Sequence, residues 1–294
     1  MPWYQLEDAN DRRLDELAKQ YNLHPLHVED ARSEEESVKV DTSAHYTFAV
    51  FKPVRLEPDP AVPAESVPVF SPVDIFAGKD FLITIADPRC SATQQALERA
   101  RRDGDDEHPA RLLYLILDTI VDLYFPAIDH FDDRIDDLED VVLADPTPAI
   151  LQRVFALKRE LIDLRRVLVN TRDASLHLQR DPESIIDAEH QLYMRDIYDH
   201  VARLLDSVET ERDLLNNTLD IYLSSVANRT NEVMKVLTVL STIALPVIAI
   251  SGIYGMNLRG LPFEQSAHGA EYVALLTMLC TVLLLYLLRR MKWF

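Results

Sequence analysis

The sequence is poor in glycine, and this shortage excludes ATP-driven classes of protein. Only six of the 294 residues are glycine, and just two of them, Gly78 and Gly104, precede Gly252. A phosphate-binding loop needs closely spaced glycines so that backbone amides can approach the phosphates. We therefore expect no ATP to be bound and set an ATP-driven pump aside.

Cysteine and catalytic motifs are scarce as well. The two cysteines, Cys90 and Cys280, imply neither a disulfide framework nor a thiolate metal site. No nucleophile–base pair or metal-catalytic motif stands out, so we do not expect an enzyme. Residues 1–23 carry charges throughout and have no apolar core. A cleavable signal peptide is therefore not expected, and the following region should stay in the cytoplasm.

Positive charge is in deficit over most of the chain. Three of the 49 acidic and five of the 30 basic residues lie after Asn231. The preceding region therefore carries 46 acidic and 25 basic residues, a net charge of −21. Such a surface repels phosphate, so we expect no nucleic-acid partner. It favours cationic partners, although an acidic surface can also serve solubility alone.

Two long apolar segments lie near the end of the chain. Residues 233–253 contain Lys235 as their single charge, and about 20 residues at 1.5 Å each cross roughly 30 Å of hydrocarbon. Residues 272–288 carry no charge and are followed at once by Arg289, Arg290 and Lys292. Basic residues favour the cytoplasmic side of a membrane. The pattern predicts two transmembrane helices with both chain termini in the cytoplasm.

The region before these segments changes character once. Up to residue 108 the spacing of apolar residues predicts two short helices, then strands rich in Val, Ile, Phe and Thr that form a small antiparallel sheet, with an exposed Pro-rich connection. From residue 109 the spacing is helical. The expected elements are helices at 11–21 and 25–31, strands within 46–54, 73–77 and 81–86, the Pro-rich connection at 57–68, helices at 109–142 and 151–175, and one helix from 191 to 253. That last helix would be about 90 Å long and should pack against copies of itself.

One face of the predicted long helix carries small and weakly polar residues at steps of three and four. Its members are Asn231, Met234, Thr238, Ser241, Leu245, Ile248 and Gly252. By residue type alone, such a face in a membrane helix indicates packing against another helix.

Directly after this face come Tyr254, Gly255, Met256 and Asn257. At the end of the first of two terminal membrane segments, they resemble the Gly-Met-Asn signature of the CorA family of magnesium channels. The similarity extends through residues 222–226, 231–238 and 251–253, covers most of the chain and is strongest from about 193 to 257.

The resemblance implies an α+β cytoplasmic domain with a small antiparallel sheet and a long helical hairpin. A long stalk helix joins this domain to two C-terminal transmembrane helices, and five identical chains form a homopentameric funnel in the inner (plasma) membrane. The implied parts are an α/β domain at 1–108, the hairpin at 109–190, the stalk and pore helix at 191–253, an outer loop at 254–271, and the second span with a basic tail at 272–294.

The same resemblance assigns the ion pathway. It implies an inner polar ring at Asn231, a hydrophobic constriction at Met234, Leu237 and Leu245, and further pore-lining residues at Thr238, Ser241, Ile248 and Gly252. The selectivity filter would be Gly255, Met256 and Asn257. Mg²⁺ holds its waters tightly, so neutral amide and carbonyl oxygens suit a hydrated ion better than a carboxylate ring. Glycine at 255 would also permit the turn that ends the helix.

A regulatory site for divalent ions between neighbouring soluble domains is implied as well. Its candidate residues are Glu29, Asp30, Asp118, Asp196 and His200. By residue type alone, Glu29 and Asp30 are interpreted as solvated acids at a helix end and Asp118 as a surface residue. Asp196 and His200 are interpreted as an i,i+4 pair on an exposed helix face. The acidic run at residues 129–140 reads as a solvated helix tip. His24 and His27 read as core or surface residues because Pro25 interrupts the helix that a metal pair would need.

Two departures from the family pattern remain. Residues 258–264 hold one acid and one base where many members have an acidic cluster, and N-terminal strands of longer members are expected to be absent. The leading hypothesis is a self-gated channel for Mg²⁺, with Co²⁺ or Ni²⁺ as further candidate permeants. The alternatives are a Zn²⁺ transporter of the same superfamily, which Met256 disfavours, and a membrane-anchored cation-sensing protein without transport.

Overall fold

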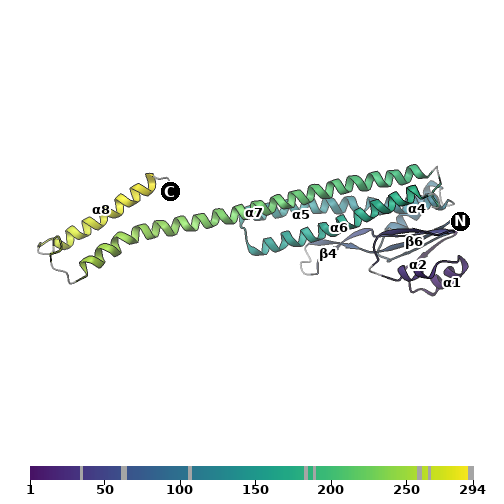
Figure 1. Ribbon diagram of the computed structural model, residues 1–294, viewed down its shortest axis with the longest axis horizontal. Helices are drawn as coiled ribbons and strands as arrows, with labels where there is room; N and C mark the ends of the chain where they lie inside the picture. The colour runs from purple at the N-terminus through teal and green to yellow at the C-terminus, as the bar shows by residue number, and fades with distance from the viewer. Residues whose placement is uncertain are drawn as a thin grey trace. The chain divides into compact units, whose positions relative to one another are not determined.

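The computed structural model describes residues 1–33, 36–60, 65–104, 108–181, 185–187, 190–256, 260–263 and 266–290. The chain forms two compact units, Met1–Leu219 and Asp220–Phe294. Figure 1 shows the strands near the N-terminus and the helices that follow them.

A five-stranded sheet and a separate two-stranded ribbon form the N-terminal part of the first unit. The sheet has the order β1-β7-β6-β3-β2, and the ribbon pairs β4 with β5. The bounds are β1 (Trp3–Leu6), β2 (Lys39–Thr42), β3 (Tyr46–Phe51), β4 (Val54–Pro58), β5 (Ser66–Phe70), β6 (Val73–Gly78) and β7 (Leu82–Ala86). Strands β3, β6 and β7 lie where the sequence predicted them.

Two expectations about this sheet are wrong. Strand β1 pairs in parallel with β7, with Trp3 opposite Leu82, so the sheet is mixed rather than antiparallel. The expectation that N-terminal strands are absent also fails, because β1 begins at Trp3. The Trp3 indole N–H donates to the Thr84 hydroxyl over 3.0 Å, which ties this short strand to its distant partner.

The two ends of the Pro-rich stretch at 57–68 belong to paired strands of one β-hairpin, so the stretch is not an exposed connection throughout. Leu56 lies opposite Pro68 and Pro58 opposite Ser66. Proline lacks the N–H that a central strand needs, but a two-stranded ribbon has only edges, so the strands tolerate it. Residues 61–64 lie outside the described part of the chain.

Two short helices cover the sheet, as predicted: α1 (Arg12–Gln20) and α2 (Pro25–Asp30). The Asp11 carboxylate accepts from the Arg13 backbone N–H and caps α1. His27 is a core histidine, since its Nδ1 lies 2.8 Å from the Tyr46 hydroxyl and its ring stacks on Phe48.

The helical part of the first unit begins with α3 (Ala92–Asp103), which the sequence did not predict. It continues with α4 (Pro109–Asp122), α5 (Tyr124–Ala144) and α6 (Pro148–Arg180). The single helix expected at 109–142 is divided at Leu123. Pro126 explains the division, because its ring has no N–H and would clash with the Asp122 carbonyl in a continuous helix.

Helix α7 (Gln191–Tyr254) has 64 residues, belongs to both units and ends one residue beyond the predicted bound. At 1.5 Å per residue it is about 95 Å long. In the first unit its apolar residues Ile197, Val201, Leu204 and Val208 are buried. Pro246 lies inside the helix without ending it.

The second unit holds the end of α7 and helix α8 (Gly269–Arg290). Both helices are long and apolar enough to cross a membrane, and hardly any of their apolar windows is buried within the chain. Large hydrophobic side chains exposed in this way require either lipid or another chain to cover them.

Candidate functional site

The signature lies at the end of α7. The Gly255 N–H donates to the Ser251 carbonyl over 2.8 Å, and the Tyr254 hydroxyl donates to the Pro262 carbonyl over 3.0 Å. Asn257, the third residue of the predicted filter, lies outside the described residues. The positive-φ glycines of the described chain are Gly104 and Gly260. Glycine at 255 therefore serves close approach, since a Cβ there would lie 3.0 Å from the Ser251 carbonyl oxygen.

The residues predicted to line a pore all lie on α7 and are not buried within the chain. Met234 is 55% exposed, and Leu245 and Ile248 are each 66% exposed. The Thr238 hydroxyl donates to the Met234 carbonyl over 2.7 Å, so its hydrogen bond is made within the helix. The large hydrophobic side chain of Leu237 is exposed. Asn231, Ser241 and Gly252 are exposed as well. Nothing in this chain covers the face among the residues described.

Three predicted regulatory residues come together on α4 and α7. One ligand atom each from Asp118, Asp196 and His200 lies within 4.8 Å of the others. His200 Nε2 lies 3.7 Å from Asp196 Oδ1. The buried His200 Nδ1 has no hydrogen-bond partner in the part of the chain that the structure describes. The group offers two carboxylates and an imidazole to a cation.

A cation already in the chain shares this cluster. Arg99 on α3 donates to Asp118 over 2.7 Å, and the Asp118 side chain is only 8% exposed. Burial and then the neighbouring Asp118 raise the pKa of Asp122. Burial, followed by Asp118 and Asp196, raises the pKa of Tyr114 to about 12. Burial is the larger cause of both raised values, and the neighbouring carboxylates add to it.

Glu29 and Asp30 lie apart from this cluster, on α2. Glu29 is exposed. Asp30 forms an ion pair with Lys39 over 2.7 Å, and the same ammonium also binds Glu36 over 2.8 Å. Within the described chain, neither residue belongs to a three-ligand group with Asp118, Asp196 and His200. A shared ion would therefore need carboxylates from two subunits.

The acidic run occupies α5, and all of its members from Asp129 to Asp140 except Glu139 are exposed. Glu139 accepts a hydrogen bond from the Thr218 hydroxyl over 3.0 Å. Burial, followed by the charges of Asp132 and Asp136, raises the pKa of Glu211 to about 7. This helix is solvated, as expected, and its field reaches a buried carboxyl of α7.

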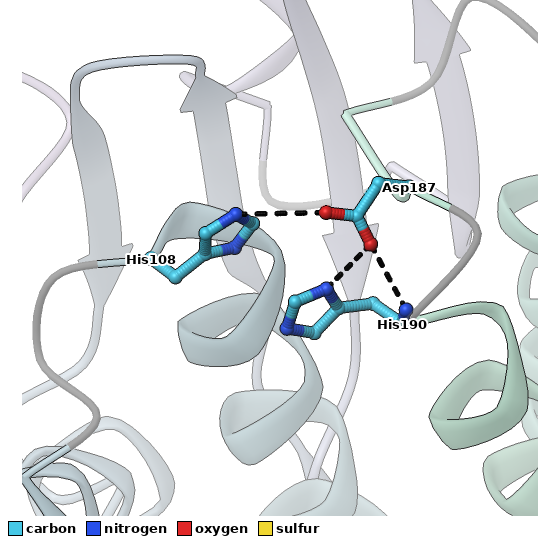
Figure 2. A group of neighbouring side chains, drawn as sticks. All are labelled: His108, Asp187 and His190. Carbon is cyan, nitrogen blue, oxygen red and sulfur yellow. Dashed lines mark hydrogen bonds and ion pairs between the residues drawn. The ribbon is translucent and has the colours of Figure 1, made fainter.

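A second ligand group was not predicted from the sequence. It consists of His108 before α4, and of Asp187 and His190 before α7 (Figure 2). His190 Nδ1 lies 2.6 Å from Asp187 Oδ1, and His108 Nε2 lies 3.6 Å from Asp187 Oδ2. The hydrogen bonds from His190 lower the pKa of the Asp187 carboxyl. The Asp187–His190 spacing of three residues is the one signal that the sequence offered.

Comparisons with known proteins cover nearly the whole chain. Residues 1–290 match the family model described as CorA-like Mg²⁺ transporter protein. The chain is 34% identical over 276 residues to the cobalt/magnesium transport protein CorA of Thermotoga maritima, which spans 93% of this chain and 77% of the relative. It is 25% identical over 295 residues to the protein of that name in Methanocaldococcus jannaschii, spanning 99% of this chain and 90% of the relative.

A solved structure agrees with the fold. The complete CorA magnesium transporter from Methanocaldococcus jannaschii superposes with a TM-score of 0.85 at 25% identity, covering 99% of this chain and 91% of that one. The two relatives carry the names of transport proteins, not enzymes. With the apolar helices α7 and α8, these matches show that the chain is a membrane protein and a member of the CorA-like Mg²⁺ transporter family.

Proposed function

We propose that the chain is one subunit of a homopentameric channel that admits Mg²⁺ across the plasma membrane, with Co²⁺ and Ni²⁺ as further permeant ions. The observation that carries this proposal is the uncovered face of α7, which runs from Asn231 to Gly252 and leads directly to Gly255 and Met256. The names of the relatives, cobalt/magnesium transport proteins, support Mg²⁺ and Co²⁺.

The composition of the face favours a pore over a plain anchor. An anchor needs only apolar residues toward lipid, whereas Asn231 and Ser241 offer polar groups within or beside a membrane span. Polar groups in such places usually face other helices or water. In a ring of copies, Asn231 would form the inner ring, Met234, Leu237 and Leu245 the constriction, and Asn257 the outer filter.

The filter chemistry suits an ion that keeps its water. Mg²⁺ gives up its hydration shell reluctantly. Amide oxygens of five Asn257 side chains and nearby backbone carbonyls can accept hydrogen bonds from bound water without holding the ion too tightly for release. A carboxylate at position 257 would bind the ion more strongly and slow its passage.

The Asp118–Asp196–His200 cluster supports feedback control by cytoplasmic Mg²⁺. We propose that an ion bound there is shared with Glu29 and Asp30 of the neighbouring subunit and favours the closed channel. The His200 Nδ1, which has no hydrogen-bond partner among the described residues, and the close approach of the three ligand atoms support an ion at this cluster. The ion can favour the closed state only by binding it more tightly than the open one.

The orientation follows from charge. Arg289 and Arg290 end α8, and the positive-inside rule supports the proposal that this end lies on the cytoplasmic side. Two spans then put both termini in the cytoplasm. A cysteine introduced near either terminus should resist a membrane-impermeant thiol reagent in intact cells, and labelling from outside would overturn this orientation.

A Zn²⁺ transporter is the second candidate function. The imidazole of His200 in the carboxylate cluster favours it, because zinc binds nitrogen ligands better than magnesium does. A cation sensor without transport is the third candidate, and only a flux measurement separates it from a channel.

Uptake into liposomes tests all three candidates. The purified full chain is reconstituted around ion-sensitive dyes, and influx of Mg²⁺, Co²⁺, Ni²⁺ and Zn²⁺ is followed separately. The proposal expects fast Mg²⁺ entry that Co²⁺ or Ni²⁺ can share. Entry of Zn²⁺ alone would establish the second candidate, and no entry of any ion would establish the third.

A further inference from the structure

We propose that His108, Asp187 and His190 form a binding site for a divalent transition-metal ion, distinct from the Asp118–Asp196–His200 cluster. The site lies where the segments that precede α4 and α7 meet, and Figure 2 shows the three side chains directed toward one another. It does not depend on the proposed channel function.

The spacing of the ligand atoms suits a small ion. In a tetrahedral site with metal–ligand distances of about 2.0–2.1 Å, ligand atoms lie about 3.3 Å apart. His190 Nδ1 lies 2.6 Å from Asp187 Oδ1 and His108 Nε2 lies 3.6 Å from Asp187 Oδ2, so the two oxygens of one carboxylate lie at distances on either side of that value. Small rotations of the Asp187 carboxylate would equalise them. Three protein ligands then leave a fourth position for water.

One of the two imidazoles is held in place before any ion arrives. His190 packs against Tyr193, and its side chain is only 10% exposed. The His108 ring stacks on it with centroids 4.5 Å apart and planes 10° apart. Because nitrogen lone pairs lie in the ring planes, the His108 ring would turn out of this stack for both nitrogens to face one ion. His108 and Asp187 are about half exposed, which leaves room for this turn and for an ion to enter from solvent.

The His108 side chain does not cap helix α4. His108 stands at the N-cap position of α4, yet its side chain makes no capping hydrogen bond to that helix. Asp187 does have a structural role, because its carboxylate accepts from the His190 backbone N–H over 3.0 Å. The competing explanation is a plain hydrogen-bonded turn of Asp187 and His190 on which the His108 ring stacks, and the metal titration separates it from a binding site.

The donor set selects the type of ion. Two nitrogens and one carboxylate oxygen suit Zn²⁺, Co²⁺ or Ni²⁺, whereas Mg²⁺ prefers six oxygens in an octahedron. On binding, the ion would take the position between His190 Nδ1 and Asp187, and a neutral His190 ring would carry its single proton on Nε2.

The position of the site gives it a mechanical consequence. Helix α4 carries Asp118, and α7 carries Asp196 and His200, whereas His108, Asp187 and His190 lie in the segments that lead into these two helices. Arg111 lies over the rings of Tyr114 and Tyr193, at 5.1 Å and 4.7 Å from their centroids, and packs the two helices between the clusters. A transition metal at the helix starts would fix the spacing that the second cluster needs.

Metal titration of the purified full chain in detergent, stripped by a chelator, tests the site. Zn²⁺ binding is measured by calorimetry, and Co²⁺ binding by its visible absorption. We expect His108→Ala and His190→Ala to lose one ion per chain or to bind it at least 100-fold more weakly, because loss of a ligand should cost more than loss of an outer-shell partner. A large excess of Mg²⁺ should not displace the Zn²⁺.

His177→Ala is the matched control, because His177 is half exposed, lies 3.7 Å from Asp181 and belongs to none of the three-ligand groups among described residues. It should bind like the wild type, and His200→Ala should keep this ion too. Asp187→Asn preserves shape and guards against misfolding, so it should weaken Zn²⁺ while the thermal unfolding midpoint stays near that of the parent. Unchanged Zn²⁺ binding in His108→Ala, or ready displacement by Mg²⁺, would overturn the proposal.

Discussion

The two parts of helix α7 differ in what covers their apolar side chains. In the first unit, Val201 and Leu204 are buried by the same chain, whereas Leu245 and Ile248 in the second unit are two-thirds exposed. The backbone is α-helical in both parts. The difference teaches that the first part is stabilised by its own domain, while the second takes its stability from surroundings outside the chain.

The largest expected effect belongs to the uncovered part. Asn257→Ala should abolish Mg²⁺ uptake into liposomes and leave assembly intact, since it removes a ring of amide oxygens and little volume. Asn10→Ala, an exposed asparagine near the N-terminus, is the control and should transport normally. Uptake by Asn257→Ala at the wild-type rate would end the filter assignment.

Changes at Asp196 should move gating without touching permeation. Asp196→Lys supplies a positive charge beside Asp118 and should give a channel that closes without Mg²⁺. Asp196→Ala should weaken inhibition instead, because one carboxylate ligand is gone. Current against internal Mg²⁺ measures both variants, and two unchanged inhibition curves would remove this cluster from the gating proposal.

A matched pair of leucines tests the comparison directly. Leu204→Ala should destabilise the first unit by about 3 kcal/mol, because it leaves a cavity in a packed core. Leu245→Ala should change that unit's stability by less than about 0.5 kcal/mol and should act on ion leakage instead. Denaturant unfolding of the full chain in detergent measures the first effect. Equal losses of stability would show that the two parts of α7 are not stabilised separately.

The smallest effect concerns pH and a buried acid of the sheet. Burial raises the pKa of Asp74 to about 8, so folding favours its protonated form. Its contribution to stability is highest below the ordinary value near 4 and is lost as the pH rises toward 8. Asp74→Asn should therefore gain roughly 1–3 kcal/mol over the wild type at pH 8 and little at pH 4. A constant difference across this range would contradict the assignment.

The sequence predicted the elements whose signals are local. Helix α7 was placed to within one residue at its C-terminal end because its apolar spacing runs without glycine until Gly252. Strands β6 and β7 followed from β-branched residues on both sides of a Gly-Lys-Asp turn. Strand β1 was not predicted, because four residues are too few to show a strand pattern and its partner strand lies about 80 positions away in the sequence.

The candidate sites divide in the same way. Asp196 and His200 share a helix face and could be paired from spacing, but their meeting with Asp118 depends on how α4 and α7 pack. His108 could not be connected to Asp187 from sequence, since both lie outside helices and periodicity says nothing about such positions. Lys39 was missed as the partner of Asp30 because the two lie on separate elements.

The shared helix also sets an order of events during synthesis. Leu219, the last residue of the first unit, precedes Val233 at the start of the apolar span by 14 residues, or roughly 1–3 s of translation at typical rates. The first unit is thus complete in sequence before the apolar span is made. Its N-terminal strands and helices can therefore begin to fold before that span is finished.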